Sequence, residues 1–240
     1  MGSVYGPNMV TDGLIMMLDA TNVQSYPGSG TVWYDLTKTM SSNPILRNGP
    51  VYTSSSYFDF DGSNDYVQLY PGNEHAFTPD GTIGYNVICY ELWVRNTGGD
   101  VSGYYMSRAW NGSGQYNFYL YTSGWYLSAG STAASITISG GFGDGNWHQI
   151  IVWCDTTHIG YYKDGVGTST THSMSGAAPS YGNSNIVNAI MTLYPYGEYG
   201  WNQPTHAING DVAIVKRYNR VLTAAEALQN FNAHKSRFGL

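Results

Sequence analysis

Along most of the chain, apolar and aromatic residues alternate with polar ones over short stretches that end in turn residues. In the stretch YNFYLY (116–121), Phe118 and Leu120 fall on one face of an extended strand, while Tyr119 and Tyr121 fall on the other. Turn residues such as DGSND, NGSG and KDGVG separate these stretches. This pattern is typical of an all-β protein in which one face of each sheet is buried.

The strand signal recurs at Gly13–Asp19, Tyr57–Phe60, Tyr66–Tyr70, Asn86–Val94, Tyr104–Arg108, Tyr116–Tyr121, Trp125–Ala129, Ser135–Ser139, Trp147–Cys154, His158–Lys163, Ala189–Tyr194 and Asp211–Tyr218. The segment SSNPILRNGPVYTSSS (41–56) is the most loop-like, and its prolines, Pro44 and Pro50, indicate turns or sheet edges because proline cannot donate to a central ladder. The basic cluster KRYNR (216–220) is expected on a solvated edge strand. No repeat or linker appears, which favours a single domain over residues 1–240.

Only the C-terminal end departs from this pattern. Thr223-Ala-Ala-Glu226 forms a capping box and predicts a helix from about Ala224 to His234. Ala224, Leu228 and Phe231 fall at positions i, i+4 and i+7, so we expect this apolar stripe to dock on a sheet.

The composition excludes several function classes. Charged residues make up only 11% of the chain, and its net charge of −6 disfavours nucleic-acid binding because no basic stripe precedes the last thirty residues. The longest apolar run, GLIMML, is too short to span a bilayer, so we expect no membrane insertion. Cys89 and Cys154 lie in apolar strand-like runs and are expected to be buried thiols rather than a disulfide.

The stretch YFDFDGSNDYVQLY (57–70) carries the densest group of acidic residues. Asp61, Asn64 and Asp65 could supply part of the oxygen shell that calcium requires. The spacing of the glycine excludes an EF-hand. A turn in which Asx side chains accept hydrogen bonds from nearby backbone N–H groups is favoured, with calcium as the alternative.

Aromatic residues, at 15% of the chain, exceed what one sandwich core should need. The loop YPYGEYGWNQP (194–204) is the best candidate recognition surface, because Tyr and Trp beside Gly and Asn resemble binding paratopes. A sugar ring or a neighbouring subunit could pack on these rings. The candidate contact residues are Tyr194, Tyr196, Tyr199, Trp201 and Asn202. About half of the clustered aromatic side chains along the chain are expected to pack inward.

Three segments resemble one family: GLIMMLDATNVQSYPGSGTVWYDLT with YFDFDGSNDYVQL, NWHQIIVWCDTTHIGYYKDG, and NGDVAIVKRYNRVLTAAEALQNFNAHKSRFGL. Together they are similar to laminin-G-like, concanavalin-A-like jelly rolls, in particular those in structural proteins of tailed bacteriophages. The resemblance implies a two-sheet antiparallel jelly-roll sandwich with one short C-terminal helix. It also implies that the strand after Gly210 runs beside Gly13–Asp19, and that Asp211 is the last-strand aspartate that helps hold a structural calcium in related domains.

Asp59, Asp61 and Asp65 also resemble the acid-x-acid-x-x-x-acid strand of laminarinase-type glycosidases, but that motif has glutamates at its outer positions. The four glutamates of this chain form no such pair, and no nucleophile elbow, HExxH, CxxC or P-loop is present. The six histidines show no metal-ligand spacing. We therefore expect no enzymatic activity.

The resemblance favours a virion structural protein of a tailed phage, associated with capsid, neck or tail and located in the virion. Its expected partners are other virion proteins and further copies of the chain, bound through Tyr-rich surfaces. The alternative is a carbohydrate-binding module, free-standing or contacting host polysaccharide. No nucleic acid and no cofactor beyond a possible structural calcium are expected.

Overall fold

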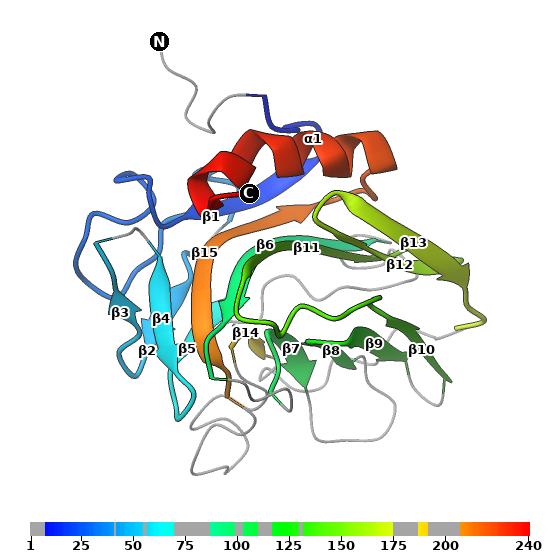
Figure 1. Ribbon diagram of the computed structural model, residues 1–240, viewed down its shortest axis with the longest axis horizontal. Coiled ribbons are helices and arrows are strands. Elements are labelled where there is room, and N and C mark those ends of the chain that lie inside the picture. The colour runs from blue at the N-terminus through cyan, green and yellow to red at the C-terminus, as the bar shows by residue number, and fades with distance from the viewer. Residues whose placement is uncertain are drawn as a thin grey trace.

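The computed structural model of the protein describes residues 8–40, 42–54, 57–69, 87–98, 103–109, 117–129, 132–174, 187–191 and 207–240. In these residues the strands form two antiparallel sheets that pack face to face, with a single α-helix near the C-terminus (Figure 1). The expected all-β, concanavalin-A-like sandwich is thereby confirmed.

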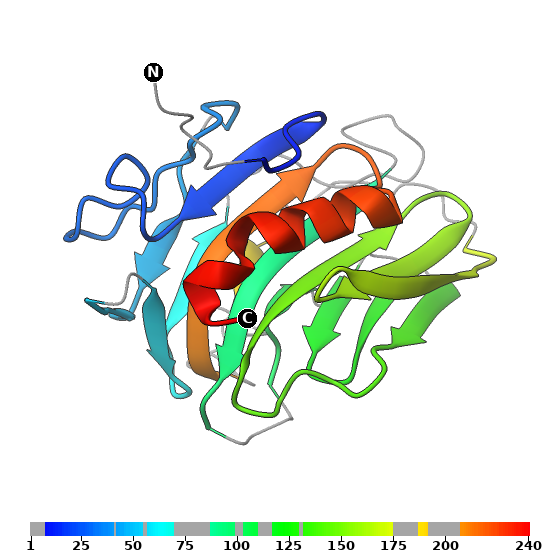
Figure 2. The same ribbon diagram turned by 45° about the horizontal axis from the view of Figure 1, so that its top comes forward.

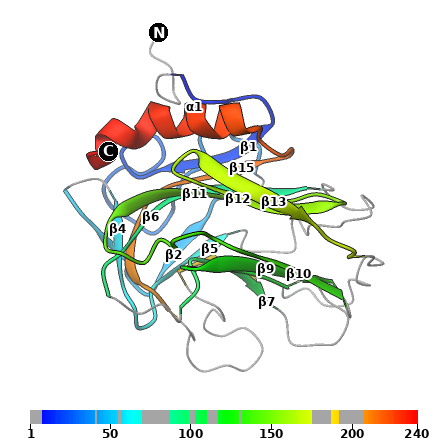
Figure 3. The same cartoon turned by 45° about the vertical axis from the view of Figure 1, so that its right-hand side comes forward.

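The eight-stranded sheet contains, in order across it, β13 (Val166–Thr171), β12 (His158–Lys163), β11 (Trp147–Cys154), β6 (Ile88–Asn96), β15 (Asn209–Tyr218), β4 (Phe58–Asp61) and β3 (Val51–Tyr52), with β1 (Leu14–Asp19) paired to β15. The seven-stranded sheet contains, in order, β10 (Thr132–Thr137), β9 (Gly124–Ala129), β8 (Asn117–Tyr121), β7 (Met106–Ala109), β14 (Val187–Ile190), β5 (Tyr66–Leu69) and β2 (Ile45–Arg47). β10 contacts β12, the neighbour of β13, so β10 and β13 end the two sheets on one side of the sandwich (Figure 3).

The core lies between the sheets and is built from every second residue of the strands. On β8, Phe118 and Leu120 point inward and are buried, as their alternation predicts. On β11, Ile150 and Val152 join the same cluster, as does Cys154, and both cysteines are free and buried. The expected pair of buried thiols is confirmed.

β15 brings the two ends of the chain together. It pairs with β6 along most of its length on one side, and on the other side with β4 through its first residues and with β1 through its last. The pairing of β15 with β6 has a register shift between Val212 and Ile214, where the partner on the other side of β15 changes from β4 to β1. The expected pairing of the last strand with the N-terminal strand is therefore confirmed.

Two stretches in which no strand was expected contain strands. The segment 41–56 carries β2 and β3, which are the terminal strands of the two sheets on the side opposite β10 and β13. Pro44 and Pro50 directly precede them, which agrees with the expectation that these prolines lie at turns or edges. The residues after the turn Asp164-Gly165 form β13, the second arm of a hairpin with β12. This arm gives no strand signal in the sequence because its Ser/Thr-rich run lacks apolar alternation.

The C-terminal helix, α1 (Ala224–His234), has the predicted bounds. The Thr223 hydroxyl accepts a hydrogen bond from the Glu226 N–H at 3.3 Å, and the Glu226 carboxylate accepts one from the Thr223 N–H at 2.8 Å, so the capping box is confirmed. A short 3₁₀ helix, η1 (Lys235–Phe238), follows. Figure 2 shows that α1 lies across the outer face of the eight-stranded sheet. Neither helix of the described chain is long and apolar enough to cross a membrane.

The helix docks through a different face from the one its apolar residues suggested. Ala224 is exposed and Leu228 is 44% exposed, whereas the buried helix residues are Ala227, Asn230 and His234. The predicted stripe is therefore wrong for Ala224 and Leu228, because two polar side chains occupy the docking face. They satisfy polar groups that the sheet presents there.

These groups form a buried polar network beneath α1. Lys216 of β15 and Glu91 of β6 form an ion pair at 2.9 Å, with both side chains 0% exposed. Asn230 donates to the second Glu91 oxygen at 2.7 Å, and Gln149 of β11 donates to the first at 3.1 Å. The Lys216 ammonium also lies 3.0 Å from Nε2 of His234. Three strands and the helix are therefore joined through one carboxylate.

The first three residues of the basic cluster KRYNR, 216–218, lie in the central strand β15, so the expectation of a solvated edge strand is wrong. Lys216 is 0% exposed and Arg217 is 4% exposed. The Arg217 guanidinium lies 5.5 Å from the centre of the Tyr90 ring, on the strand next to it. The partners that allow these charges to be buried lie far from them in the sequence, so no local pattern predicts the burial.

Aromatic stacking forms a second attachment at the C-terminal end. The Trp93 ring of β6 stacks on Phe231 of α1 and on Phe238 of η1, at centroid distances of 5.8 and 4.3 Å. Trp147 of β11 lies beside Phe238 at 4.7 Å. The third residue of the expected stripe, Phe231, therefore does contact the sheet.

Candidate binding surfaces

The aspartate-rich stretch forms a turn between β4 and β5. Asp59 and Asp61 are exposed on β4, and the Ser63 N–H donates to Asp61 Oδ1 at 2.7 Å. Gly62 has a φ of +76°, which suits glycine, and an added Cβ would meet Asn209 on β15. Burial, followed by the charge of Asp61, raises the pKa of Asp65. The Asx turn favoured by the sequence is the structure observed.

The fourth expected calcium residue, Asp211, is engaged in an ion pair. Its carboxylate lies 2.6 Å from the Arg95 guanidinium of β6, and its side chain is 2% exposed. Burial raises the pKa of Asp211, and the guanidinium offsets part of that rise. Among the described residues, no three His, Cys, Asp or Glu side chains are grouped to hold a metal. Calcium binding by Asp61, Asn64, Asp65 and Asp211 stays a prediction.

The expected recognition loop falls in a part of the chain that the structure does not describe. Tyr194, Tyr196, Tyr199, Trp201 and Asn202 all lie outside the described ranges, so their role as a glycan or subunit contact also stays a prediction.

Four tyrosines form a cluster on the outer face of the seven-stranded sheet; this tyrosine cluster consists of Tyr104, Tyr119, Tyr121 and Tyr126. Tyr119 and Tyr126 are directly opposite one another on β8 and β9, with nearly parallel rings, 13° apart, whose centroids are 5.9 Å apart. Tyr104 lies 5.2 Å from Tyr119, centroid to centroid. All four are half-buried. Such rings present both a flat apolar face and a hydroxyl group to a ligand.

The neighbours of these tyrosines point the other way. Tyr105 and Trp125 are 0% exposed and belong to the core. We expected about half of the clustered aromatic side chains to pack inward, and this part of the sheet shows such a division. Strand alternation determines which rings point outward.

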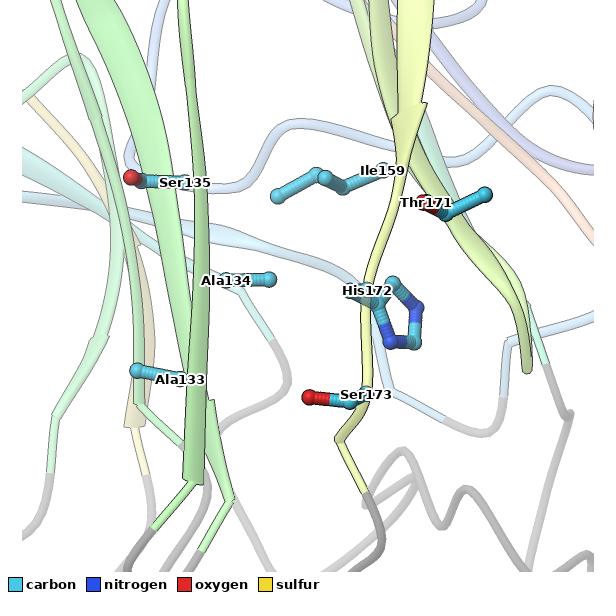
Figure 4. A pocket seen from close by; sticks show the side chains of 7 residues that line it. All are labelled: Ala133, Ala134, Ser135, Ile159, Thr171, His172 and Ser173. Atoms are coloured by element: carbon cyan, nitrogen blue, oxygen red, sulfur yellow. The ribbon is translucent and has the colours of Figure 1, made fainter.

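An open cleft of about 400 Å³ lies between the sheets, where β10 faces the ends of β12 and β13. It is lined by Ala133, Ala134, Ser135, Ile159, Thr171, His172 and Ser173. Figure 4 shows Ala134 and Ile159 pointing toward one another from the two sheets, while Ser135 and Thr171 point away. Small side chains leave this side of the sandwich incompletely filled.

A cysteine and a histidine meet beside this cleft, Cys154 Sγ lying 3.3 Å from Nε2 of His172. His172 Nδ1 accepts a hydrogen bond from the Met174 N–H, so the neutral ring carries its proton on Nε2, which lies 3.0 Å from the Asp155 carbonyl. Burial raises the pKa of the Cys154 thiol. A protonated thiol beside a ring nitrogen that is itself a donor has no base to activate it, so this pair is structural.

A second pocket, of about 510 Å³, is lined by Gln24, Tyr34, Asp35, Leu36, Thr37, Lys38, Met40 and Asn43. Its one carboxylate, Asp35, accepts hydrogen bonds from the backbone N–H groups of Met17, Thr37 and Thr39. Asp35 therefore holds the loop in place. Sequence analysis gave no signal for this pocket, which a single loop forms between β1 and β2.

The two antiparallel sheets packed face to face define a concanavalin-A-like class of fold. A family model described as the concanavalin A-like lectin/glucanases superfamily matches residues 61–227, and the chain belongs to this family. A search of curated proteins finds no match for the chain.

Solved structures with the same fold include glycan-binding proteins. Trypanosoma rangeli sialidase in complex with sialic acid superposes with a TM-score of 0.60 at 14% identity, over 93% of this chain and 33% of the sialidase. The binding domain of botulinum neurotoxin serotype D/C gives 0.59 at 12% identity, over 92% of this chain and 52% of that domain. A botulinum neurotoxin DC binding domain in complex with SialylT gives 0.59 at 11% identity, over 92% and 51%. The chain thus spans about a third to a half of these proteins, and the likeness shows the fold.

Proposed function

We propose that this protein is a non-catalytic structural component of a tailed-phage virion, associated with capsid, neck or tail. The observation that carries the proposal is the pair of uncharged, six-residue edge strands, β10 and β13, on one side of the sandwich. Proteins that remain free in solution usually protect such edges with charges, prolines or bulges. The resemblance of three segments of the chain to jelly rolls of tailed-phage structural proteins supports the same role.

The chemistry of the described residues supports the absence of catalysis. Asp61 is used in a turn, Asp211 is neutralised by Arg95, and Cys154 is a buried thiol without a base. A retaining glycosidase needs two carboxyls about 5–5.5 Å apart, one of which donates a proton to the substrate. The pKa of Asp65 is raised, but the residue is only 5% exposed and its side chain accepts a hydrogen bond from the Asp61 backbone. This environment suits a residue that stabilises a turn better than one that donates a proton to a substrate.

Mass spectrometry of density-purified particles of the phage that encodes the chain tests the proposal. We expect its peptides to co-purify with those of the capsid and tail proteins at a constant ratio across the particle peak. A phage enzyme made in the same infected cell is the matched control, because it should stay in the soluble fraction. Peptides found only in that soluble fraction would reject the virion role.

A second candidate, a carbohydrate-binding module, is favoured by the tyrosine cluster. Sugar rings pack on exposed aromatic faces, and the sialidase and toxin structures that share the fold are complexes with sialic acid and SialylT. On a glycan array that includes sialylated sugars, this candidate requires saturable binding that Tyr126→Ser weakens. Val51→Ser, at a valine 61% exposed on β3 and outside the tyrosine cluster and both pockets, is the control. If no glycan on the array is bound, the carbohydrate-binding candidate is rejected. The virion role then stands without a sugar partner.

The structural calcium belongs to the proposal as well. If Asp61, Asn64 and Asp65 bind calcium, a chelator should lower the melting temperature and added calcium should restore it. An unchanged melting temperature, together with a calcium-free metal analysis, would end this part of the proposal.

A further inference from the structure

Within the described part of the chain, β13 is an open edge strand. Its residues, VGTSTT, are all exposed on both faces, and Val166 is 73% exposed. The strand contains no charge and no proline. It pairs with β12 alone among the described strands. β3, the strand at the other end of the same sheet, has only two residues and directly follows Pro50. One end of the sheet is thus protected and the other is not.

The hairpin register determines which backbone groups of β13 face outward. The His172 N–H donates to the Thr157 carbonyl of the β12 arm. In an antiparallel pair the direction of these bonds alternates along the strand, so Val166, Thr168 and Thr170 also point toward β12. The N–H and C=O groups of the three residues between them, Gly167, Ser169 and Thr171, point away from the sheet.

β13 also extends beyond the opposite sheet. On β12, Ile159 and Tyr161 are buried at 0% and 6% exposure, whereas their partners on β13, Thr170 and Thr168, are exposed. The seven-stranded sheet therefore ends at β10, beneath β12, and the open cleft lies at this step between the two sheets (Figure 4).

From these observations we infer that β13 pairs antiparallel with β13 of a second copy of this chain, about a two-fold axis at Ser169. The outward groups then bond Gly167 to Thr171, Ser169 to Ser169 and Thr171 to Gly167 across the axis. Threonines at 168 and 170 are neighbours in the same register, and cross-strand Thr pairs are favourable. This inference rests on the proposed function, in which copies of the chain associate, and it identifies β13 as the surface through which they do so.

A second copy fits this edge because the strand is complementary to itself. An isologous contact pairs residue i with j and j with i, and only the residue on the axis, Ser169, faces its own copy, so a charge at that position would repel itself. VGTSTT has no charge to repel and is rich in β-branched side chains. Since β10 and β13 end on the same side, pairing also turns the two open clefts toward one another beneath the joined strands.

Cysteine cross-linking tests the register. In Ser169→Cys, the two introduced thiols would be directly opposite, at a Cα separation of about 5.5 Å, which a disulfide can span. We expect mild oxidation to convert most of this variant into a covalent dimer. Val51→Cys, on the exposed β3 edge of the same sheet, is the matched control and should stay monomeric on a non-reducing gel. The native cysteines are buried and should not interfere.

Charge variants provide an independent measurement by light scattering of the full chain at high micromolar concentration. Wild type should show twice the 26.3 kDa chain mass, and Ser169→Lys should raise the dimer dissociation constant about tenfold or more. Mixing Ser169→Lys with Ser169→Glu should restore the dimer, whereas Val51→Lys should change nothing. Circular dichroism checks that each variant is folded.

A monomeric wild type, a dimer insensitive to Ser169→Lys, or equal cross-linking of the two cysteine variants would overturn this pairing. None of these outcomes would remove the chain from purified particles. Failure of the pairing is therefore distinguishable from failure of the virion role.

Discussion

The outer faces of the two sheets differ in what covers them. Beneath α1, the eight-stranded sheet buries the Glu91–Lys216 ion pair and its hydrogen-bond partners (Figure 2). The corresponding face of the seven-stranded sheet carries the tyrosine cluster, whose rings are half-buried and contact one another. Both faces follow the same strand alternation, so the covering helix makes the difference. One face is closed by the helix over a buried polar network, whereas the other leaves its tyrosine rings half-exposed to solvent.

The largest effect should come from breaking the ion pair. Glu91→Ala leaves the Lys216 ammonium buried without its counter-charge, which costs about 3–5 kcal/mol in the free energy of unfolding. Urea unfolding measures this change. Asp59→Ala removes an exposed carboxylate from β4 and should change stability by less than about 0.5 kcal/mol. Equal losses in the two variants would show that the network beneath α1 is not a special source of stability.

Acid should weaken the same face. Burial, and then the charge of Lys216, lower the pKa of His234 from 6.5 to about 4. The unfolded chain therefore binds a proton that the folded chain does not, so stability is full above pH 6.5 and falls as the pH drops from 6.5 toward 4. The loss across this range is on the order of 3 kcal/mol. His234→Gln should flatten the profile between these pH values. A profile that is already flat in wild type would contradict a neutral, buried His234.

Removing the helix cap should have a smaller effect. Thr223→Ala deletes the hydroxyl that accepts the Glu226 N–H and should cost about 1 kcal/mol. Thermal unfolding measures this change. Thr223→Ser keeps the hydroxyl and should recover most of the loss, so equal destabilisation by both substitutions would point away from capping.

The smallest change in stability should come from the tyrosine cluster. Tyr126→Ser removes one cross-strand ring contact, worth about 0.2–1 kcal/mol. The same variant is the one expected to lose sugar binding if the second candidate function holds. A loss of several kcal/mol would show instead that these rings are structural, and the contrast between the two faces would fail.

Much of the fold could be predicted because its signals are local. The alternation of Phe118 and Leu120 with tyrosines determined which side of β8 is buried, and the capping box determined where α1 begins. β13 was missed because its Thr/Ser run has no apolar face. The Asp164-Gly165 turn is its local signal, since Asp-Gly pairs join the arms of two-residue hairpins. The helix face was misjudged because hydrophobicity alone does not predict a polar docking surface.

The candidate site was less accessible to sequence analysis. Asp61 and Asp211 looked like possible ligands of one ion, yet Asp211 pairs with Arg95 from a strand more than a hundred residues away in the chain. The open cleft depends on the two sheets ending at the same side, with β13 extending one strand further. Neither feature has a local pattern, because each depends on which strands become neighbours.

By itself, the sequence determined the class of structure: short strands with one buried face, tight turns between them, and a capped helix at the end. These properties depend on residues close together in the chain, through side-chain alternation, turn chemistry and capping. Only the tertiary structure decided that Lys216 and Glu91 could be buried together, that one outer face would be covered, and that β13 would be left as an open edge. Burying a charge or leaving an edge unpaired depends on the partners available in space, and the pairing of distant strands supplies those partners.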